Sequence, residues 1–280
     1  MPILTVILLT YNHAGTVEAA LNSILMQETE YEFDVHVLDD CSSDGTSEIC
    51  SQYQSRYPEK VVHCRNELNK GVTRNFKEGV MRVDSKYLAF LEGDDVWTSP
   101  KKLQMQIDKL EAHPECNLCG HNVAMYDHVT DEKSVFVNIR KADVKEVYYL
   151  SDDIYIHPSS RVYRNVIDFS KVPDFMVLDT HIYRLFLMSG QCCYIDQVMS
   201  LYNKTGTGYW TGMCKKDKKI MTLKLRYASL KYYDFQHVSE FYSRKRSLRV
   251  LKFFFGVRLG WKLFYRLEMA RLKVKYARRR

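Results

Sequence analysis

The sequence has little of what defines fibrous, low-complexity or membrane-spanning proteins. Only 12 of its 280 residues are Gly and 6 are Pro, too few for a fibrous or low-complexity chain. No segment approaches the ~18 uncharged apolar residues of a membrane-spanning helix. No basic segment precedes the first apolar run, so we expect no signal peptide and a cytosolic location. Hydrophobic residues make up 46% of the chain, enough for the cores of one or two domains.

The eight cysteines are expected to be reduced, because disulfide frameworks are rare in the cytosol. Cys116 and Cys119 have the spacing of a zinc-ligand pair. No second Cys or His pair lies at a suitable distance to complete four ligands. We therefore expect these thiols to lie in the hydrophobic core.

The net charge of +7 is divided unevenly along the chain. Residues 244–280 hold 14 Lys and Arg against one acid, a net charge of +13, whereas the first 243 residues carry −6. The composition therefore predicts an acidic globular body and a basic tail rich in aromatic residues.

Apolar segments in the first 112 residues alternate between strand and helix patterns. Residues 3–9 are almost all apolar and rich in β-branched side chains, which is typical of a strand buried on both faces. The alternation predicts an α/β fold with a doubly wound, Rossmann-like, mostly parallel sheet and helices on both faces. In such folds ligands bind beyond the carboxyl ends of the strands. The strands are expected at 3–9, 33–38, 61–62 and 87–91, and the helices at 14–26, 46–57, 71–83 and 100–112.

Polar side chains follow three of these strands at the point where each ends. A pair of acids such as Asp39 and Asp40 can accept hydrogen bonds from a base or ribose, although such residues also serve as turn and capping residues. Glu92, Asp94 and Asp95 would repel one another without a cation, and their oxygens suit Mg²⁺ or Mn²⁺ carrying a diphosphate.

Four motifs follow one another along the first hundred residues: Thr10–Tyr11–Asn12, Asp39–Asp40 with Ser43–Asp44–Gly45–Thr46, Asn69–Lys70–Gly71 with Arg74–Asn75, and Glu92–Gly93–Asp94–Asp95–Val96–Trp97. Their order and spacing resemble family 2 glycosyltransferases with the GT-A fold. The resemblance covers residues 3 to about 215 and implies a nucleotide-sugar donor, usually linked to UDP. It places the base of the nucleotide near Tyr11 and Asp39. It also places Arg74 close to the base or the diphosphate. Glu92–Gly93–Asp94 matches the family's Asp-X-Asp metal motif with Glu first, which leaves open which of Glu92, Asp94 and Asp95 binds metal.

The resemblance also implies inversion at the sugar by direct displacement, which needs a carboxylate base for the acceptor hydroxyl. Asp179 matches the segment that carries this base, and it is also placed to cap a helix over 180–189. His121 and His157 resemble positions that face the acceptor, although a lone His is more often a structural residue.

Relatives often carry a His where this chain has Thr205, and that His assists at the metal or diphosphate. Lys204 is the alternative partner for a phosphate. Gly206, Gly208 and Trp210 suit a mobile flap over the donor that contacts the acceptor, or a plain surface loop.

Beyond the catalytic part, residues 216–243 have a helical pattern and are expected to pack on the body. Residues 244–280 fit two short amphipathic helices that bind an anionic membrane surface. A protein partner, including a second copy of the chain, is the next alternative for this tail, and nucleic acid is not expected. We place the glycosyltransferase domain at 1–215, divided into a nucleotide-sugar-binding half (1–125) and an acceptor half (126–215).

These features predict a metal-assisted, inverting glycosyltransferase at the cytoplasmic face of the cell membrane. Its acceptor would be a lipid-linked oligosaccharide or a surface polysaccharide. One alternative is a nucleotide-binding, membrane-attached scaffold that has lost transfer. A receiver-like phosphoacceptor domain also has paired acids at a strand end, but the chain length and the second acidic cluster argue against it.

Overall fold

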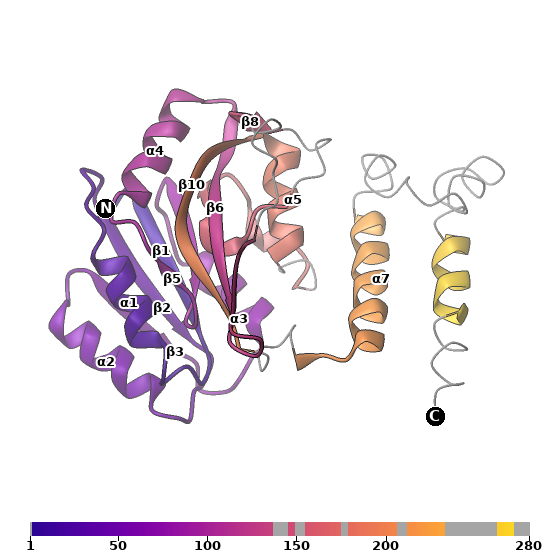
Figure 1. Cartoon of the computed structure of the whole chain (residues 1–280), viewed down its shortest axis with the longest axis horizontal. Helices are drawn as coiled ribbons and strands as arrows, with labels where there is room; N and C mark the ends of the chain where they lie inside the picture. The colour runs from indigo at the N-terminus through magenta and orange to yellow at the C-terminus, as the bar shows by residue number, and fades with distance from the viewer. Residues whose placement is uncertain are drawn as a thin grey trace. The chain divides into compact units, whose positions relative to one another are not determined.

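The computed structural model describes residues 2–136, 145–148, 155–174, 179–205, 212–232 and 262–271. Strands and helices alternate through the N-terminal half, and each of the strands and helices expected there is present (Figure 1). The elements of this half are β1 (Leu4–Thr10), α1 (Val17–Leu25), β2 (Phe33–Asp39), α2 (Thr46–Arg56), β3 (Val61–Arg65), α3 (Val72–Val80), β4 (Tyr87–Glu92), β5 (Val96–Trp97) and α4 (Lys102–Ala112).

The second half adds long strands that extend the same sheet and short strands that pair with them. Its elements are β6 (Cys116–Asp127), β7 (Glu132–Val135), β8 (Val147–Tyr148), β9 (Val162–Arg164), α5 (Asp179–Ser189), β10 (Gln191–Lys204) and α7 (Lys215–Tyr232), with 3-10 turns η3 (Pro158–Ser160) and η4 (Phe169–Lys171).

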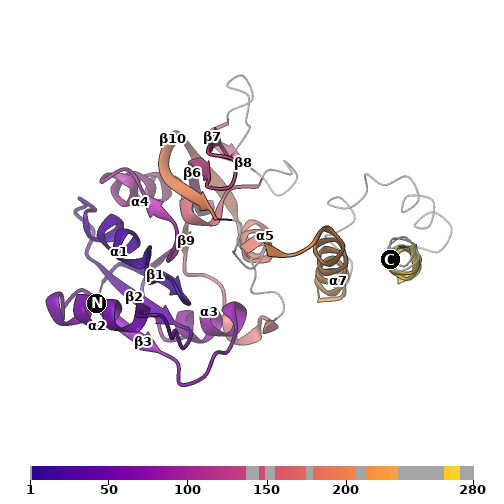
Figure 2. The ribbon, with the colours of Figure 1, turned by 60° about the horizontal axis from the view of Figure 1, so that its bottom comes forward.

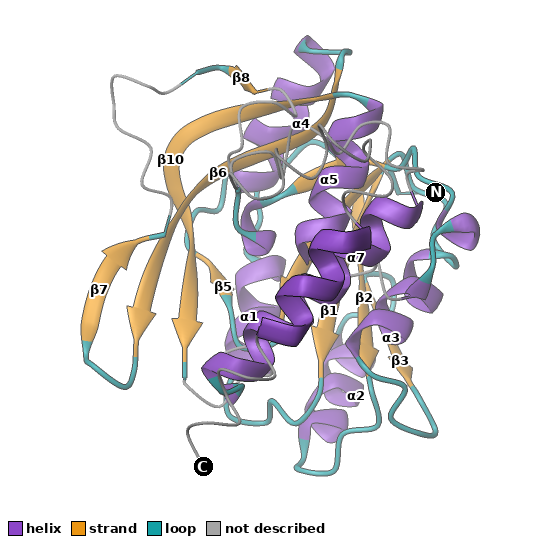
Figure 3. Ribbon diagram, turned by 90° about the vertical axis from the view of Figure 1, so that its right-hand side faces the viewer, coloured by secondary structure: helices purple, strands orange, loops and turns teal. Residues whose placement is uncertain are grey.

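The strands form one sheet in the order β3-β2-β1-β4-β9-β6-β10-β5, with β7 beside β6 and β8 beside β10. β1 pairs in parallel with β2 and β4, β2 with β3, and β6 with β10. The arrowheads of β1, β2, β3, β6 and β10 point the same way in Figure 3. The short strands β5, β7, β8 and β9 pair antiparallel. The predicted fold class, a doubly wound and mostly parallel α/β sheet, is confirmed.

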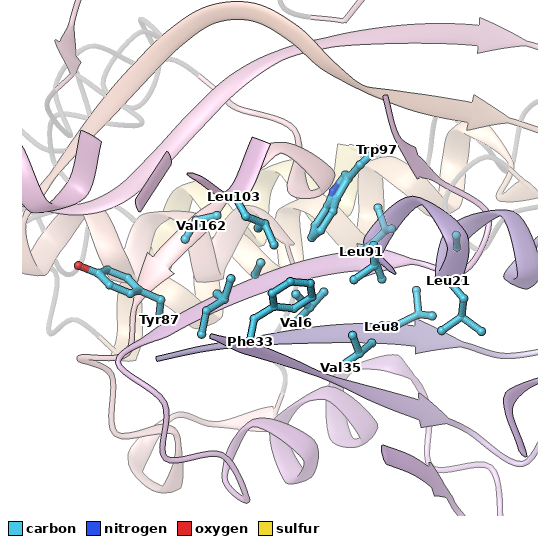
Figure 4. Packing of buried hydrophobic residues seen from close by; sticks show 14 of the residues in the cluster. Val6, Leu8, Leu21, Phe33, Val35, Tyr87, Leu91, Trp97, Leu103 and Val162 are labelled. Carbon is cyan, nitrogen blue, oxygen red and sulfur yellow. The ribbon is translucent and has the colours of Figure 1, made fainter. Parts of the chain in front are cut away.

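Helices cover both faces of the sheet, with α1 and α2 on one side of β1 and β2 and α3 on the other (Figure 2). Under the first face, alternate residues of β1 such as Val6 and Leu8 pack with Leu21 of α1 and Leu103 of α4 (Figure 4). These side chains are fully buried, and each such burial contributes roughly 1.5–3 kcal/mol relative to exposure. As expected, Cys116 and Cys119 lie in the same core. Phe33, Val35, Tyr87, Leu91, Trp97, Val162 and Cys193 also belong to it.

The opposite face is packed mainly by aromatic rings. Phe76 of α3 meets Phe90 of β4 edge-on at 4.7 Å between ring centroids. Phe90 in turn contacts Tyr163 of β9 at 5.0 Å, and Tyr163 contacts Phe186 of α5 at 4.2 Å. This row of rings joins α3 and β4 of the N-terminal half to β9 and α5 of the second half, so the two halves share one packed layer.

The chain divides into two compact units, residues 1–205 and 206–280. In the second unit, α7 falls within the region expected to be helical, and a further helix covers residues 262–271. Most of the expected membrane-associating tail lies outside the described residues. In the parts of the chain that the structure describes, no helix has the length and apolar character needed to cross a membrane. The predicted domain boundary at 215 stays a prediction.

Candidate functional site

The carboxyl ends of β1, β2 and β4 meet at one edge of the sheet. In the strand register Thr10 lies opposite Asp39, and Leu9 lies opposite Glu92. Tyr11, the first residue beyond β1, leaves 46% of its surface exposed. The structure therefore brings an exposed aromatic ring and the two predicted acidic clusters to the same edge, where doubly wound folds bind their ligands.

Gly93 allows the acidic segment after β4 to approach the end of β1. Its N–H donates to the carbonyl of Leu9 at 2.8 Å. A Cβ atom at this position would lie 2.6 Å from Nδ1 of His13 and 3.0 Å from Oγ1 of Thr10. A side chain at residue 93 would therefore displace the side chains of His13 and Thr10 at the end of β1.

Hydrogen bonds tie the loop after β1 to the loop after β2. The N–H of Asn12 donates to Oγ of Ser42, and the N–H of Ser43 donates to Oδ1 of Asn12, both at 2.9 Å. Asn12 and Cys41 have positive φ angles of 55° and 67°. Such backbone conformations cost on the order of 1–3 kcal/mol for a residue other than Gly and persist only where neighbours enforce them. The predicted ligand residue Asn12 thus also shapes the site.

Asp39 is fully buried at the end of β2. Its Oδ1 accepts the N–H of Ser42 at 2.9 Å, and its Oδ2 accepts the hydroxyl of Ser47. Nε2 of His63 and Nε of Arg65 lie 3.5 and 3.8 Å from Oδ2. Burial by itself raises the pKa of Asp39, but the hydrogen bonds from His63, Ser42 and Ser47 outweigh burial and hold the pKa well below its usual range. The carboxylate is charged but covered, and its predicted contact with a base stays a prediction.

Asp40 holds the loop that precedes α3. Its Oδ1 accepts the side-chain N–H of Asn66 at 2.9 Å and the backbone N–H of Lys70 at 2.8 Å. Its Oδ2 accepts the N–H of Gly71 at 2.8 Å. With only 4% of its surface exposed, Asp40 serves the fold in this structure, and its predicted contact with the donor stays a prediction.

Arg74 is an exposed cation in the first turn of α3, which follows this loop. Its side chain is 61% exposed, and its Nε donates to Oε1 of Glu78 at 2.8 Å, one helical turn away. Lys70 binds the other oxygen of Glu78 at 2.6 Å. An exposed pair of this kind contributes little to stability, so Arg74 can leave Glu78 at small cost when an anion binds.

The three acids after β4 have different environments. Glu92 is exposed, whereas Asp95 is 2% exposed and accepts the N–H of Asn203 at 3.1 Å. Burial raises the pKa of Asp95 well above its usual range, and the charges of Glu92 and Asp94 raise it further. Oδ1 of Asp94 is buried and lacks a hydrogen-bond partner among the described residues. A buried oxygen without a partner is costly unless a ligand or cation satisfies it, so Asp94 is the acid best suited to a bound ion.

Carboxylates can hold a metal as a cage of protein side chains alone, or as one or two ligands together with substrate phosphates and water. The described residues fit the second of these modes. Nowhere among the described residues do three His, Cys, Asp or Glu side chains converge as a protein cage for a metal. Which of Glu92, Asp94 and Asp95 binds a metal stays a prediction. Mg²⁺ in phosphate-transfer sites is usually held by one or two carboxylates together with substrate phosphates and water. The buried Oδ1 of Asp94 fits this second mode.

The end of β10 completes the rim of the site and contributes a residue that the sequence did not reveal. Asn203 donates from its side-chain Nδ2 to the carbonyl of Asp94 at 2.8 Å. Its partner lies 109 positions earlier, so no local pattern could identify it. Lys204, the predicted phosphate partner, forms an ion pair with Asp127. Trp210 lies outside the described residues.

The predicted acceptor residues are buried. His121 is 0% exposed, and burial holds its pKa well below the usual range for His. His157 is 7% exposed, with Nδ1 2.8 Å from Oγ of Ser159. Neither ring offers a surface to an acceptor in this structure, and their assignment stays a prediction. Asp179 is the first residue of α5, but its side chain is outside the described part, so its predicted role as a base also stays a prediction.

This chain is similar to known proteins both in sequence and in fold. The model of the family described as glycosyl transferase family 2 matches residues 5–168. An uncharacterized protein of Mycobacterium tuberculosis, Rv1520, is 29% identical over 208 residues, which cover 74% of this chain and 60% of that protein. The dTDP-rhamnosyl transferase RfbG of Shigella flexneri is 31% identical over 122 residues, 42% of this chain and 41% of the transferase. The chain thus spans less than two thirds of these relatives.

Two solved structures share the fold. The S. aureus protein TarS, in complex with UDP-GlcNAc, superimposes with a TM-score of 0.57 at 18% identity, over 81% of this chain and 66% of TarS. The mannosyltransferase PcManGT of Pyrobaculum calidifontis, in complex with GDP-Man and Mn²⁺, gives a TM-score of 0.60 at 16% identity, over 82% of this chain and 64% of that enzyme. At this identity the likeness establishes the GT-A fold.

Proposed function

The chain belongs to glycosyl transferase family 2, and we propose that it is an inverting, metal-assisted transferase that uses a UDP-sugar. The observation that carries the proposal is the buried Oδ1 of Asp94, which has no hydrogen-bond partner among the described residues and lies at the edge of the sheet where β1, β2 and β4 end. TarS binds UDP-GlcNAc and PcManGT binds GDP-Man with Mn²⁺ on the same fold, which supports a nucleotide-sugar held with a divalent cation.

The exposed groups of the site suit the parts of such a donor. The ring of Tyr11, 46% exposed, offers a face for the base, and stacking of a base on an aromatic ring contributes about 1–3 kcal/mol. Arg74 offers a cation to the base or diphosphate. Asp94, with Glu92 beside it, would hold Mg²⁺ or Mn²⁺, which neutralises charge on the departing diphosphate.

In the transfer step, the acceptor hydroxyl attacks the anomeric carbon from the side opposite the diphosphate. The bond from that carbon to the diphosphate oxygen breaks, and the configuration at the carbon inverts. Asp179, at the start of α5, takes the proton of the attacking hydroxyl. Direct displacement requires a single base of this kind and no covalent intermediate on the protein.

We propose a lipid-linked oligosaccharide or a surface polysaccharide as the acceptor. RfbG, a relative over 42% of this chain, is a dTDP-rhamnosyl transferase, which supports a glycan product. The tail, with its net charge of +13 over residues 244–280, suits attachment to an anionic membrane, where each Lys or Arg contributes up to about 1 kcal/mol. We infer that the chain works at the cytoplasmic face of the membrane.

Isothermal titration of UDP, with and without MnCl₂, tests the assignment of Asp94. Asp94→Asn removes the charge while keeping the shape, so it should abolish the gain in UDP affinity that Mn²⁺ provides. Asp108→Asn, at an exposed acid of α4, is the matched control and should behave as wild type. Normal Mn²⁺-dependent affinity in Asp94→Asn would remove Asp94 from the metal site.

A further inference from the structure

Residues 94–98, the segment that begins with Asp94, form hydrogen bonds with residues 199–203 at the end of β10. The N–H of Thr98 donates to the carbonyl of Met199 at 2.9 Å. Next to it, β5 pairs antiparallel with β10, with Trp97 opposite Ser200 and Val96 opposite Leu201. This strand pairing ends at Val96, two residues after Asp94 in the chain, so it does not reach the acidic residues themselves.

Asn203 takes over where the strand pairing stops. Its backbone N–H donates to Oδ1 of Asp95 at 3.1 Å, and its side-chain Nδ2 donates to the carbonyl of Asp94 at 2.8 Å. One residue thus binds the side chain of one acid and the backbone of the other. The side chain of Asp94 is left out of this network, and its buried Oδ1 has no partner among the residues described.

His128, at the end of the neighbouring strand β6, fixes the orientation of this amide. Its Nε2 lies 3.1 Å from Oδ1 of Asn203. Because an amide oxygen only accepts hydrogen bonds, Nε2 is the donor, and Nδ2 of Asn203 is directed to Asp94. The His128 ring contacts Tyr126 at 4.4 Å between centroids, with the two planes tilted by 58°, and the backbone N–H of His128 donates to the carbonyl of Lys204 at 3.1 Å.

We propose that His128 and Asn203 are positioning residues of the donor site, which hold the backbone of Asp94 so that its carboxylate meets the cation on the donor diphosphate. This inference rests on the proposed function, because it takes Asp94 as the acid that binds the cation. Groups that orient a metal ligand typically change metal affinity about 10- to 100-fold when they are removed. Neither residue touches the cation itself.

Titration of UDP and GDP, each with and without MnCl₂, on the full chain tests the proposal. Asn203→Ala should lower the Mn²⁺-dependent affinity for the nucleotide about 10-fold and leave the metal-free affinity within about 2-fold. His128→Ala should give a smaller loss of the same kind. His128→Gln should restore the affinity, because the Gln amide places a donor near the position of Nε2, and adding His128→Ala to Asn203→Ala should cause no further loss.

His113→Ala, at the carboxyl end of α4, is the control and should match wild type. Because His128 is exposed, its variants should fold even if Asn203→Ala does not, and they then carry the test. Wild-type affinity in His128→Ala and Asn203→Ala, with the loss intact in Asp94→Asn, would refute the positioning role alone. If Asp94→Asn is also without effect, or if wild type binds neither nucleotide, the proposed function fails with it.

Discussion

Substitution of Asp40 by Asn separates a structural role from a ligand-binding role for the second acid of the pair. Asp40 is 4% exposed and accepts three hydrogen bonds, from Asn66, Lys70 and Gly71, at 2.8–2.9 Å. An Asn amide keeps one oxygen for two of these donors and turns its NH₂ toward the third. A hydrogen bond to a charged group contributes about 1.5–3 kcal/mol, and an unsatisfied buried donor costs about 1–3 kcal/mol.

Asp40→Asn should therefore lower the free energy of unfolding by roughly 2–4 kcal/mol, since one charge-assisted bond is lost and two are weakened. Urea unfolding followed by circular dichroism measures this change as a lower midpoint at an unchanged slope. The control Asp84→Asn, at an exposed acid between α3 and β4, should change the free energy of unfolding by less than about 0.5 kcal/mol. A variant of Asp40 that is as stable as wild type but binds no UDP would refute the structural role and assign Asp40 to the ligand.

Three further perturbations have expected outcomes. The ammonium of Lys102 is buried 4.0 Å from the centre of the Trp97 ring, and burial lowers its pKa to about 7. Between pH 7 and 10.5 the unfolded chain therefore binds more protons than the folded chain. Lys102→Met should raise the free energy of unfolding most, compared with wild type, below pH 7. The difference between variant and wild type should then shrink by about 1.4 kcal/mol per pH unit from pH 7 to 9. A difference that does not change with pH would contradict this. Asp179→Asn should slow transfer by roughly 10²-fold or more with donor binding unchanged, whereas near-normal turnover would place the base elsewhere. Deletion of residues 244–280 should abolish salt-sensitive co-sedimentation with anionic vesicles while UDP binding persists, and a full chain that ignores such vesicles would contradict the membrane role.

The sequence predicted the strands that are buried on both faces and the residues at which they end. Residues 4–10 and 87–92 are apolar almost without interruption, because each of these strands lies between two layers of helices. The two-residue strand β5 and the three-residue strand β9 are too short to show a period, so no sequence pattern predicted them. They form because long strands elsewhere in the sheet supply their partners.

In the site, too, local motifs predicted the positions of residues, whereas contacts between distant residues decided their hydrogen bonds. The motifs located Asp39, Asp40 and Asp94 at one edge, but they could not reveal which carboxylates the protein itself satisfies. The carboxylate of Asp40 accepts hydrogen bonds from residues 26 to 31 positions away in the chain. Asn203 donates hydrogen bonds to residues more than 100 positions earlier. Side-chain direction and hydrogen-bond partners of this kind are set by tertiary structure, so they are absent from local patterns.

Release of nucleoside diphosphate from a panel of nucleotide-sugars tests most directly whether the chain is a metal-assisted glycosyltransferase. The full chain is incubated with each donor and Mg²⁺ or Mn²⁺, then with a chelator, and slow hydrolysis of the donor suffices when no acceptor is present. We predict release from a UDP-sugar that requires the cation and is lost in Asp94→Asn. Failure to release nucleoside diphosphate from any donor, or release that neither the chelator nor Asp94→Asn affects, would contradict the proposed function.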